Sequence, residues 1–137
     1  MPYVSNSILD TTKKVLGLDS EAKMFDEDIL MHINSVFSQL HQLGVGPEDG
    51  FEISDTSTLW SAYLGDNKKV NLVKTYMYLK VRMFWDPPTT SFAITAVNDQ
   101  IKELEWRINV AVDTKELVYV PIEDDENNPT EPNWGDE

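Results

Sequence analysis

The chain of 137 residues is long enough for one domain with its own apolar core, and 41% of its residues are hydrophobic. Its formal net charge of −13 argues against a general nucleic-acid binder, because such proteins carry a basic surface. The absence of cysteine excludes disulfides and thiolate metal sites, and no apolar run approaches the roughly 18 residues that a membrane-spanning helix needs.

The first predicted helix covers residues 7–16, and Gly17 suits the left-handed position that ends a helix. Asp10 precedes Lys13 and Lys14 by three and four residues, so local ion pairs are expected on the helix surface. Five side chains are expected to face the core: Ile8, Leu9, Thr12, Val15 and Leu16. In the connector that follows, Leu18, Met24 and Phe25 are expected to fold back onto the core.

A second helix is predicted over residues 28–43, with acidic side chains at its N-terminus, where the macrodipole favours negative charge. Gly44 ends it, and an irregular acidic segment follows. In that segment Phe51 and Ile53 alternate with polar residues, as in a short edge strand. Ser57 is then expected to cap a helix of one to two turns.

Two long helices are predicted next, over residues 68–85 and 91–110. The first is apolar over roughly two-thirds of its circumference, so several elements must pack on it. It stops at Pro87, because proline disfavours the helical conformation of the residue before it and cannot donate a backbone hydrogen bond. The second helix has one apolar stripe: Ala93, Val97, Ile101, Leu104 and Ile108. A connection this short favours a long antiparallel helix hairpin.

The remainder of the chain changes character. Residues 116–120 have the β-branched and aromatic composition of a short strand or extended arm, and an acidic tail follows. The expected fold class is therefore all-α. We expect a helical domain in residues 1–116 and an extended arm with an acidic, flexible tail in residues 117–137.

No residue pattern predicts catalysis, a metal site or a cofactor. His32 and His41 are nine residues apart on one predicted helix, which places them on opposite sides of it. The glycines of the 44–46 loop follow a helix and lack the rest of a dinucleotide-binding fingerprint. The acidic run at residues 123–126 lacks the glycine and the closing glutamate of a calcium-binding loop. We therefore expect a protein that is not an enzyme.

A family resemblance is carried by Tyr78–Pro88, Ser91-Phe92 and Gln100–Asn109, and upstream by Ile33-Asn34-Ser35 and Gln42–Gly46. They resemble the head–tail connector, or adaptor, proteins of tailed bacteriophages, and the likeness covers residues 5–110. The shared features are packing and turn motifs. They include the residues that we expect to build the hairpin: Trp85, Asp86, Pro87, Pro88, Leu104 and Trp106.

The resemblance implies a structural virion protein. Family members usually assemble as twelve subunits under the portal, join head to tail and extend the DNA channel. The implied partners are further copies of the chain, the portal protein and the next neck or tail-completion protein, with DNA only as passing cargo and no membrane. The implied location is the virion neck, after assembly in the host cytoplasm, and no cofactor or catalytic residue is implied.

Segregated charges suggest how such a ring could be held together. Residues 68–82 contain five basic residues and no acid. In a head-to-tail ring this basic face would meet an acidic face of the next subunit. The expected contact residues are Lys68, Lys74, Arg82, Asp26 and Asp28. Three further residues are expected to dock on the portal or a neighbour: Val120, Ile122 and Trp134.

The main alternative is an acidic DNA mimic, or a regulatory protein, that binds a nucleic-acid enzyme. That class predicts carboxylates at phosphate-like spacing and no basic strip, whereas residues 68–82 form such a strip. Trp60, Trp85 and Trp106 are expected in the core or in a contact between subunits, because aromatic side chains dominate the buried area of small domains.

Overall fold

The computed structural model describes residues 6–122. Its helices in chain order are α1 (Ile8–Val15), the 3-10 turn η1 (Lys23–Phe25), α2 (Asp26–Gln42), α3 (Ser61–Leu64), α4 (Val70–Trp85) and α5 (Ser91–Asp113). Within these residues the only β pairing consists of two isolated bridges, Ser7 with Leu59 and Gly65 with Val120. The described part of the chain is therefore all-α, as the sequence predicts.

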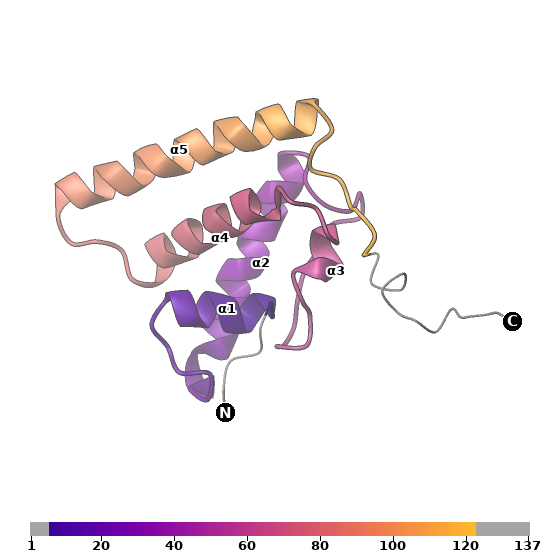
Figure 1. Cartoon of the computed structure of the whole chain (residues 1–137). Coiled ribbons are helices and arrows are strands. Elements are labelled where there is room, and N and C mark those ends of the chain that lie inside the picture. The colour runs from indigo at the N-terminus through magenta and orange to yellow at the C-terminus, as the bar shows by residue number, and fades with distance from the viewer. Residues whose placement is uncertain (1–5, 123–137) are drawn as a thin grey trace, which may run out of the picture.

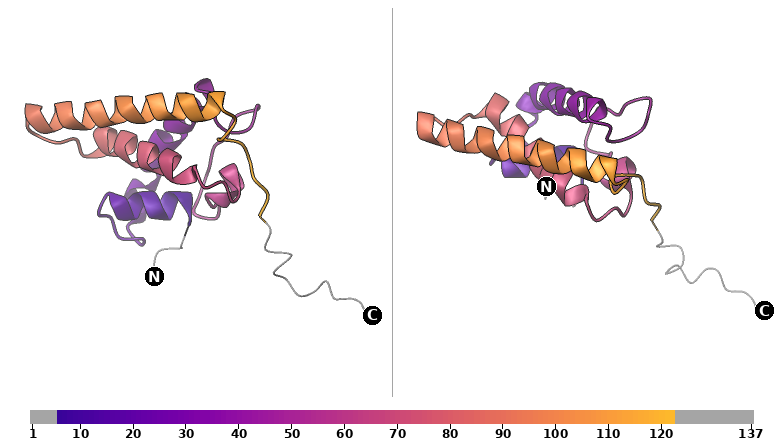
Figure 2. Two further views of the ribbon diagram at one scale, coloured as in Figure 1. Left: turned by 45° about the horizontal axis from the view of Figure 1, so that its top comes forward. Right: turned by 90° about the horizontal axis from the view of Figure 1, so that it is seen from above.

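Helix α4 lies at the centre of the fold (Figure 1). The α5 helix runs along it on the side away from α1, and α2 crosses it obliquely, in contact with it (Figures 1 and 2). Val73, Met77 and Val81 are fully buried on α4. The Tyr76 hydroxyl donates to Glu105 Oε2 at 2.9 Å and so links α4 to α5. The wide apolar arc of residues 68–85 thus matches a helix that is covered from more than one side.

The core is built mainly by α2 and by the segment that follows it. Five residues of α2 are buried at helical spacing: Ile29, Ile33, Val36, Phe37 and Leu40. The ring of Phe37 lies 5.0 Å from that of Phe51 and 4.7 Å from that of Tyr63. Trp60 completes this aromatic cluster and donates its indole N–H to Thr11 Oγ1 at 3.0 Å. The cluster ties α2 to α3 and α1.

Two expectations for the N-terminal region are wrong. Val15 is exposed, whereas Lys13 is fully buried. Met24 is also exposed, whereas its neighbour Phe25 packs against Trp85 with the two ring centres 4.9 Å apart. The direction of a side chain on such short elements depends on which helix lies opposite, and the local pattern does not contain that information.

The acidic segment after α2 does not form the expected edge strand. Instead the Asn34 side chain imitates a neighbouring strand, since it accepts from Ile53 N at 2.9 Å and donates to Ile53 O at 3.0 Å. Ser57 does not cap a helix either. Its backbone N–H and its hydroxyl both donate to Asp55 Oδ1, and α3 begins only at residue 61.

The connection between α4 and α5 follows the predicted chemistry. Asp86 leaves the helical conformation before Pro87, although its N–H still donates to Arg82 O at 2.7 Å. Thr90 caps α5 by accepting from Ala93 N at 3.1 Å. Two residues of the predicted apolar stripe, Ile101 and Ile108, are buried, whereas Ala93, Val97 and Leu104 are half-buried. Ala111, which lies outside the predicted stripe, is also buried.

Residues 117–122 lie against the helical domain. Leu117 is buried, Val120 N donates to Leu64 O at 3.0 Å, and Asp66 N donates to Val120 O at 2.7 Å. Gly65 makes this approach possible, because a Cβ atom there would lie 1.8 Å from Val120 O. The acidic tail, including Trp134, lies outside the described residues. No helix in the described range is long and apolar enough to cross a membrane.

Candidate interaction surfaces

The three predicted basic contact residues have different surroundings. Lys68 and Arg82 are exposed at the two ends of the central helix. Lys74 is half-buried, with its Nζ atom 3.3 Å from Asn6 Oδ1 and 5.8 Å from the centre of the Trp60 ring. Burial lowers the pKa of Lys74. Lys74 therefore interacts within its own subunit, and the other two are better placed to meet a partner.

The two predicted acidic contact residues also differ. Asp28 is exposed, but Asp26 Oδ1 lies 2.9 Å from Lys13 Nζ. The Lys13 ammonium also donates to Ser20 O at 3.1 Å, so it is held by two elements from inside the fold. This buried ion pair joins α1 to the start of α2. Asp26 is thus part of the subunit's own structure.

A groove of about 640 Å³ lies between the first half of α4 and the second half of α5. We call it the basic groove. Its lining residues are Lys68, Lys69, Asn71, Leu72, Thr75, Leu104, Trp106, Arg107, Val110, Ala111 and Glu116. Lys69 Nζ lies 3.7 Å from Glu116 Oε1, and Arg107 Nη2 lies 3.1 Å from Glu103 Oε2. Trp106 is 66% exposed and Val110 41% exposed, so large apolar side chains here face solvent.

A second set of exposed apolar side chains is carried by η1, the first half of α2 and the last turn of α4. We call it the methionine patch. It consists of Met24, Met31 and Phe84, which are 80%, 59% and 50% exposed. His32 stacks on Phe84 with 5.1 Å between ring centres, which connects the helices under the patch. Glu27 and Asp28 are exposed beside it, on the first turn of α2.

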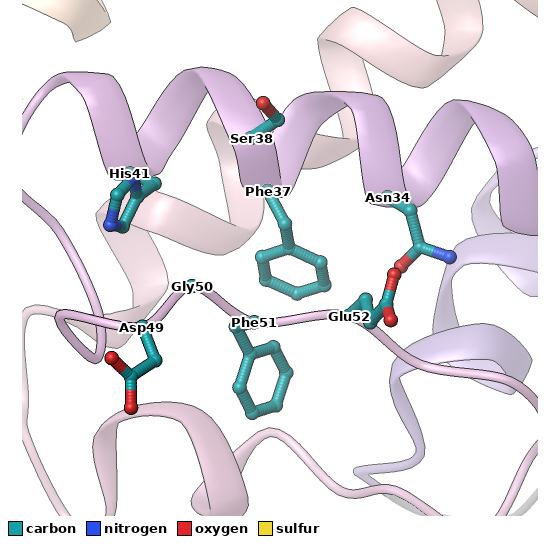
Figure 3. A pocket seen from close by; sticks show the side chains of 8 residues that line it. All are labelled: Asn34, Phe37, Ser38, His41, Asp49, Gly50, Phe51 and Glu52. Atoms are coloured by element: carbon teal, nitrogen blue, oxygen red, sulfur yellow. The ribbon is translucent and has the colours of Figure 1, made fainter.

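A second hollow, of about 420 Å³, lies between α2 and the loop after it (Figure 3). Ser38, His41 and Asp49 line it, which raises the question of a catalytic triad. Figure 3 shows the Ser38 hydroxyl and the Asp49 carboxylate pointing away from the His41 ring. The His41 Nε2 atom lies 2.8 Å from Glu48 O, so the ring supports the loop. The arrangement is that of a structural contact and does not suit nucleophilic catalysis.

The described residues also contain no group of three histidine, aspartate or glutamate side chains that could hold a metal ion. His32 and His41 do not converge, since one stacks on Phe84 and the other contacts the loop at Glu48. The features that remain on the surface are suited to binding another macromolecule, because exposed apolar patches with charged rims mark such contacts.

The remaining predicted residues fall into two groups. Trp85, Pro88 and Leu104 are half-buried in the helix pair, while Asp86, Pro87 and Trp106 are exposed. Val120 and Ile122 present side chains to solvent at the end of the described chain, although the Val120 backbone is bound to the domain. Trp106 is exposed and therefore not in the core, and neither the basic groove nor the methionine patch was predicted from the sequence.

A family model described as a phage connector protein matches residues 8–115. The match begins at the first residue of α1 and ends just after α5, so it covers every helix of the fold. No curated protein and no solved structure matches the chain.

Proposed function

Because the chain belongs to the phage connector protein family, we propose that it forms a ring under the portal, joins the phage head to the tail and extends the DNA channel. The family match carries this proposal, since it covers the whole helical fold. A structural connector role also agrees with the exposed apolar side chains on the surface of the described residues.

The proposed ring has twelve copies of this chain, and its other partners are the portal protein and the next neck or tail-completion protein. DNA passes through as cargo. A net charge of −13 supports this, because a strongly acidic ring would not grip the phosphate backbone. We place the protein in the virion neck, after assembly in the host cytoplasm.

A second part of the proposal concerns the tail. Residues 123–137 contain seven acids, no base and one large apolar side chain, Trp134. We propose that the tail docks on the portal or on a neighbouring subunit, with Val120, Ile122 and Trp134 as apolar anchors. An extended segment with apolar residues at intervals is suited to a partner's groove or sheet edge.

The test is the mass of the purified protein alone and with the portal protein of the same phage, by light scattering or native mass spectrometry. A ring on the portal is the expected result. A monomer that does not bind portal would contradict the proposal. In that case the alternative of an acidic protein that occupies a nucleic-acid enzyme would be examined, although the cations at the basic groove do not favour it.

A further inference from the structure

The basic groove and the methionine patch lie at opposite ends of the central helix. Lys68 and Leu72 belong to the groove and stand just before and within the first turn of α4, whereas Phe84 belongs to the last turn. The helix has 16 residues and is therefore about 24 Å long. One subunit cannot fill its own groove with its own patch, so any contact between the two surfaces requires another copy.

The two surfaces share an apolar character. Met24 and Met31 are exposed on the patch, and methionine adapts to irregular apolar hollows because its chain is flexible. The groove is concave, with Leu72, Leu104 and Val110 among its apolar lining. A protruding apolar patch that fits a hollow elsewhere on the same molecule produces a head-to-tail contact.

Their charges are partly complementary. Glu27 and Asp28 lie beside Met24 and Met31, with the exposed cations Lys23 and Arg82 at the same end, while Lys68, Lys69 and Arg107 line the groove. Contact between two grooves would bring like charges together. Contact between a groove and a patch brings unlike charges together, which sets orientation and excludes the wrong pairing. Glu103 and Glu116 offset part of the positive charge of the groove, since they pair with Arg107 and Lys69.

We propose that the methionine patch of one subunit inserts into the basic groove of the next copy of this chain, and that this repeated contact builds the ring. The inference rests on the proposed function and names the surfaces that it uses. Of the contacts expected from the sequence, Asp28 and Lys68 stay in the interface, whereas Arg82 lies at the patch end of α4 and does not line the groove. Lys74 and Asp26 leave it, because each is held inside its own subunit, and Arg107 and Trp106 join it.

Cross-linking tests the contact directly, because the chain has no cysteine and each introduced thiol is unique. Ser35→Cys places a thiol one helical turn after Met31, and Asn71→Cys places one in the groove. The two variants are mixed on the portal protein and treated with a short bis-maleimide. We expect dimers that join position 35 to position 71, and none when the exposed Ser54→Cys replaces Ser35→Cys.

Dimers that join two copies of position 71, or two of position 35, would overturn the proposal in favour of a symmetric contact. The absence of any dimer between positions 35 and 71 in a mixture that forms rings would overturn it as well. That result would point to the tail or the portal protein as the occupant of the groove.

Charge reversal supplies a second test. Lys68→Glu alone and Asp28→Lys alone should each lose the ring on the portal, while the chain that carries both changes should recover it. Circular dichroism checks that every variant is folded. If wild type forms a ring and both single variants form it equally well, this interface is wrong and the proposed function stands. If wild type forms no ring on the portal, the proposed function itself fails.

Discussion

Lys13 has its charged group inside the fold, although it belongs to a residue type that is almost never fully buried without a partner. Asp26 and the carbonyl oxygen of Ser20 supply the partners. A buried ion pair contributes little net stability, but the loss of one partner leaves an uncompensated charge. The pair therefore fixes where α1 docks on α2 more than it strengthens the fold.

Replacing Lys13 with alanine should destabilise the protein by about 3 kcal/mol, because Asp26 loses its counter-charge and the side chain leaves a cavity. Lys13→Met keeps most of the volume and should cost less. Urea unfolding measures both, and Lys14→Met, at an exposed position, is the matched control. Equal stability of Lys13→Ala and Lys14→Met would show that the pair does not hold α1 in place.

Tyr63 is buried in the aromatic cluster, and burial raises the pKa of its phenol well above the ordinary value near 10. The folded protein therefore holds this proton more tightly than the unfolded chain does. Its contribution to stability is complete below about pH 10 and is lost as the pH rises further, because the unfolded chain ionises first. Burial also raises the pKa of Tyr76 and Tyr78.

Tyr63→Phe should therefore weaken the loss of stability above about pH 10, without abolishing it, because two other buried phenols remain. Urea unfolding at several alkaline pH values measures the slope of the free energy of unfolding against pH. Tyr119→Phe, at an exposed position, should leave the slope unchanged. A slope that Tyr63→Phe does not alter would mean that the Tyr63 phenol ionises as readily in the folded protein as in the unfolded chain.

At the scale of elements, α5 buries only a narrow strip of its surface. It has 23 residues, of which only Ile101, Ile108 and Ala111 are buried. These three residues share one face, and that face lies on α4. Much of the rest of α5 is exposed, so the helix depends on a narrow strip for its attachment and offers a long surface to partners.

Ile108→Asp should unfold the protein or detach α5, because burying a carboxylate without a partner costs several kcal/mol. The neighbouring Asn109 is exposed, so Asn109→Asp is the matched control and should leave stability within about 0.5 kcal/mol. Val97→Asp and Leu104→Asp should be milder, since both side chains are half-buried. A folded Ile108→Asp variant with unchanged melting temperature would contradict this packing.

At the scale of the whole molecule, the fold exposes apolar side chains at the groove, at the patch and along residues 118–122, and its acidic tail continues from Ile122. The tail adds seven negative charges to a domain that already has both signs on its surface. Each subunit thus offers a groove, a patch and a tail, and the proposed ring would use different surfaces for neighbouring subunits and for the portal.

Truncation after Ile122 should leave the melting temperature nearly unchanged, because every described contact of the domain is retained. Binding to the portal should weaken, since Trp134 and the seven acids are removed. Calorimetry or a pull-down with the portal protein measures the binding. Trp134→Ala in the full chain separates the effect of the apolar side chain from that of the seven acidic residues. Undiminished portal binding by the truncated chain would show that the tail is not a docking arm.

The sequence by itself determined the helices and their ends. Helical periodicity and turn chemistry are local, so α2, α4 and α5 lie close to their predicted bounds, and Pro87 and Thr90 act where their chemistry requires. The family resemblance is local as well, because it rests on contiguous packing and turn motifs, and the family match confirms it.

Only the tertiary structure decided which side chains are covered. Lys13 is inside and Met24 outside because of where α2 and α4 lie relative to them, and a helical pattern does not encode that arrangement. The basic groove arises for the same reason, since its residues come from two helices and from Glu116 beyond them. Whether an apolar residue belongs to the core or to a binding surface depends on the neighbour opposite it, and that neighbour is distant in the sequence.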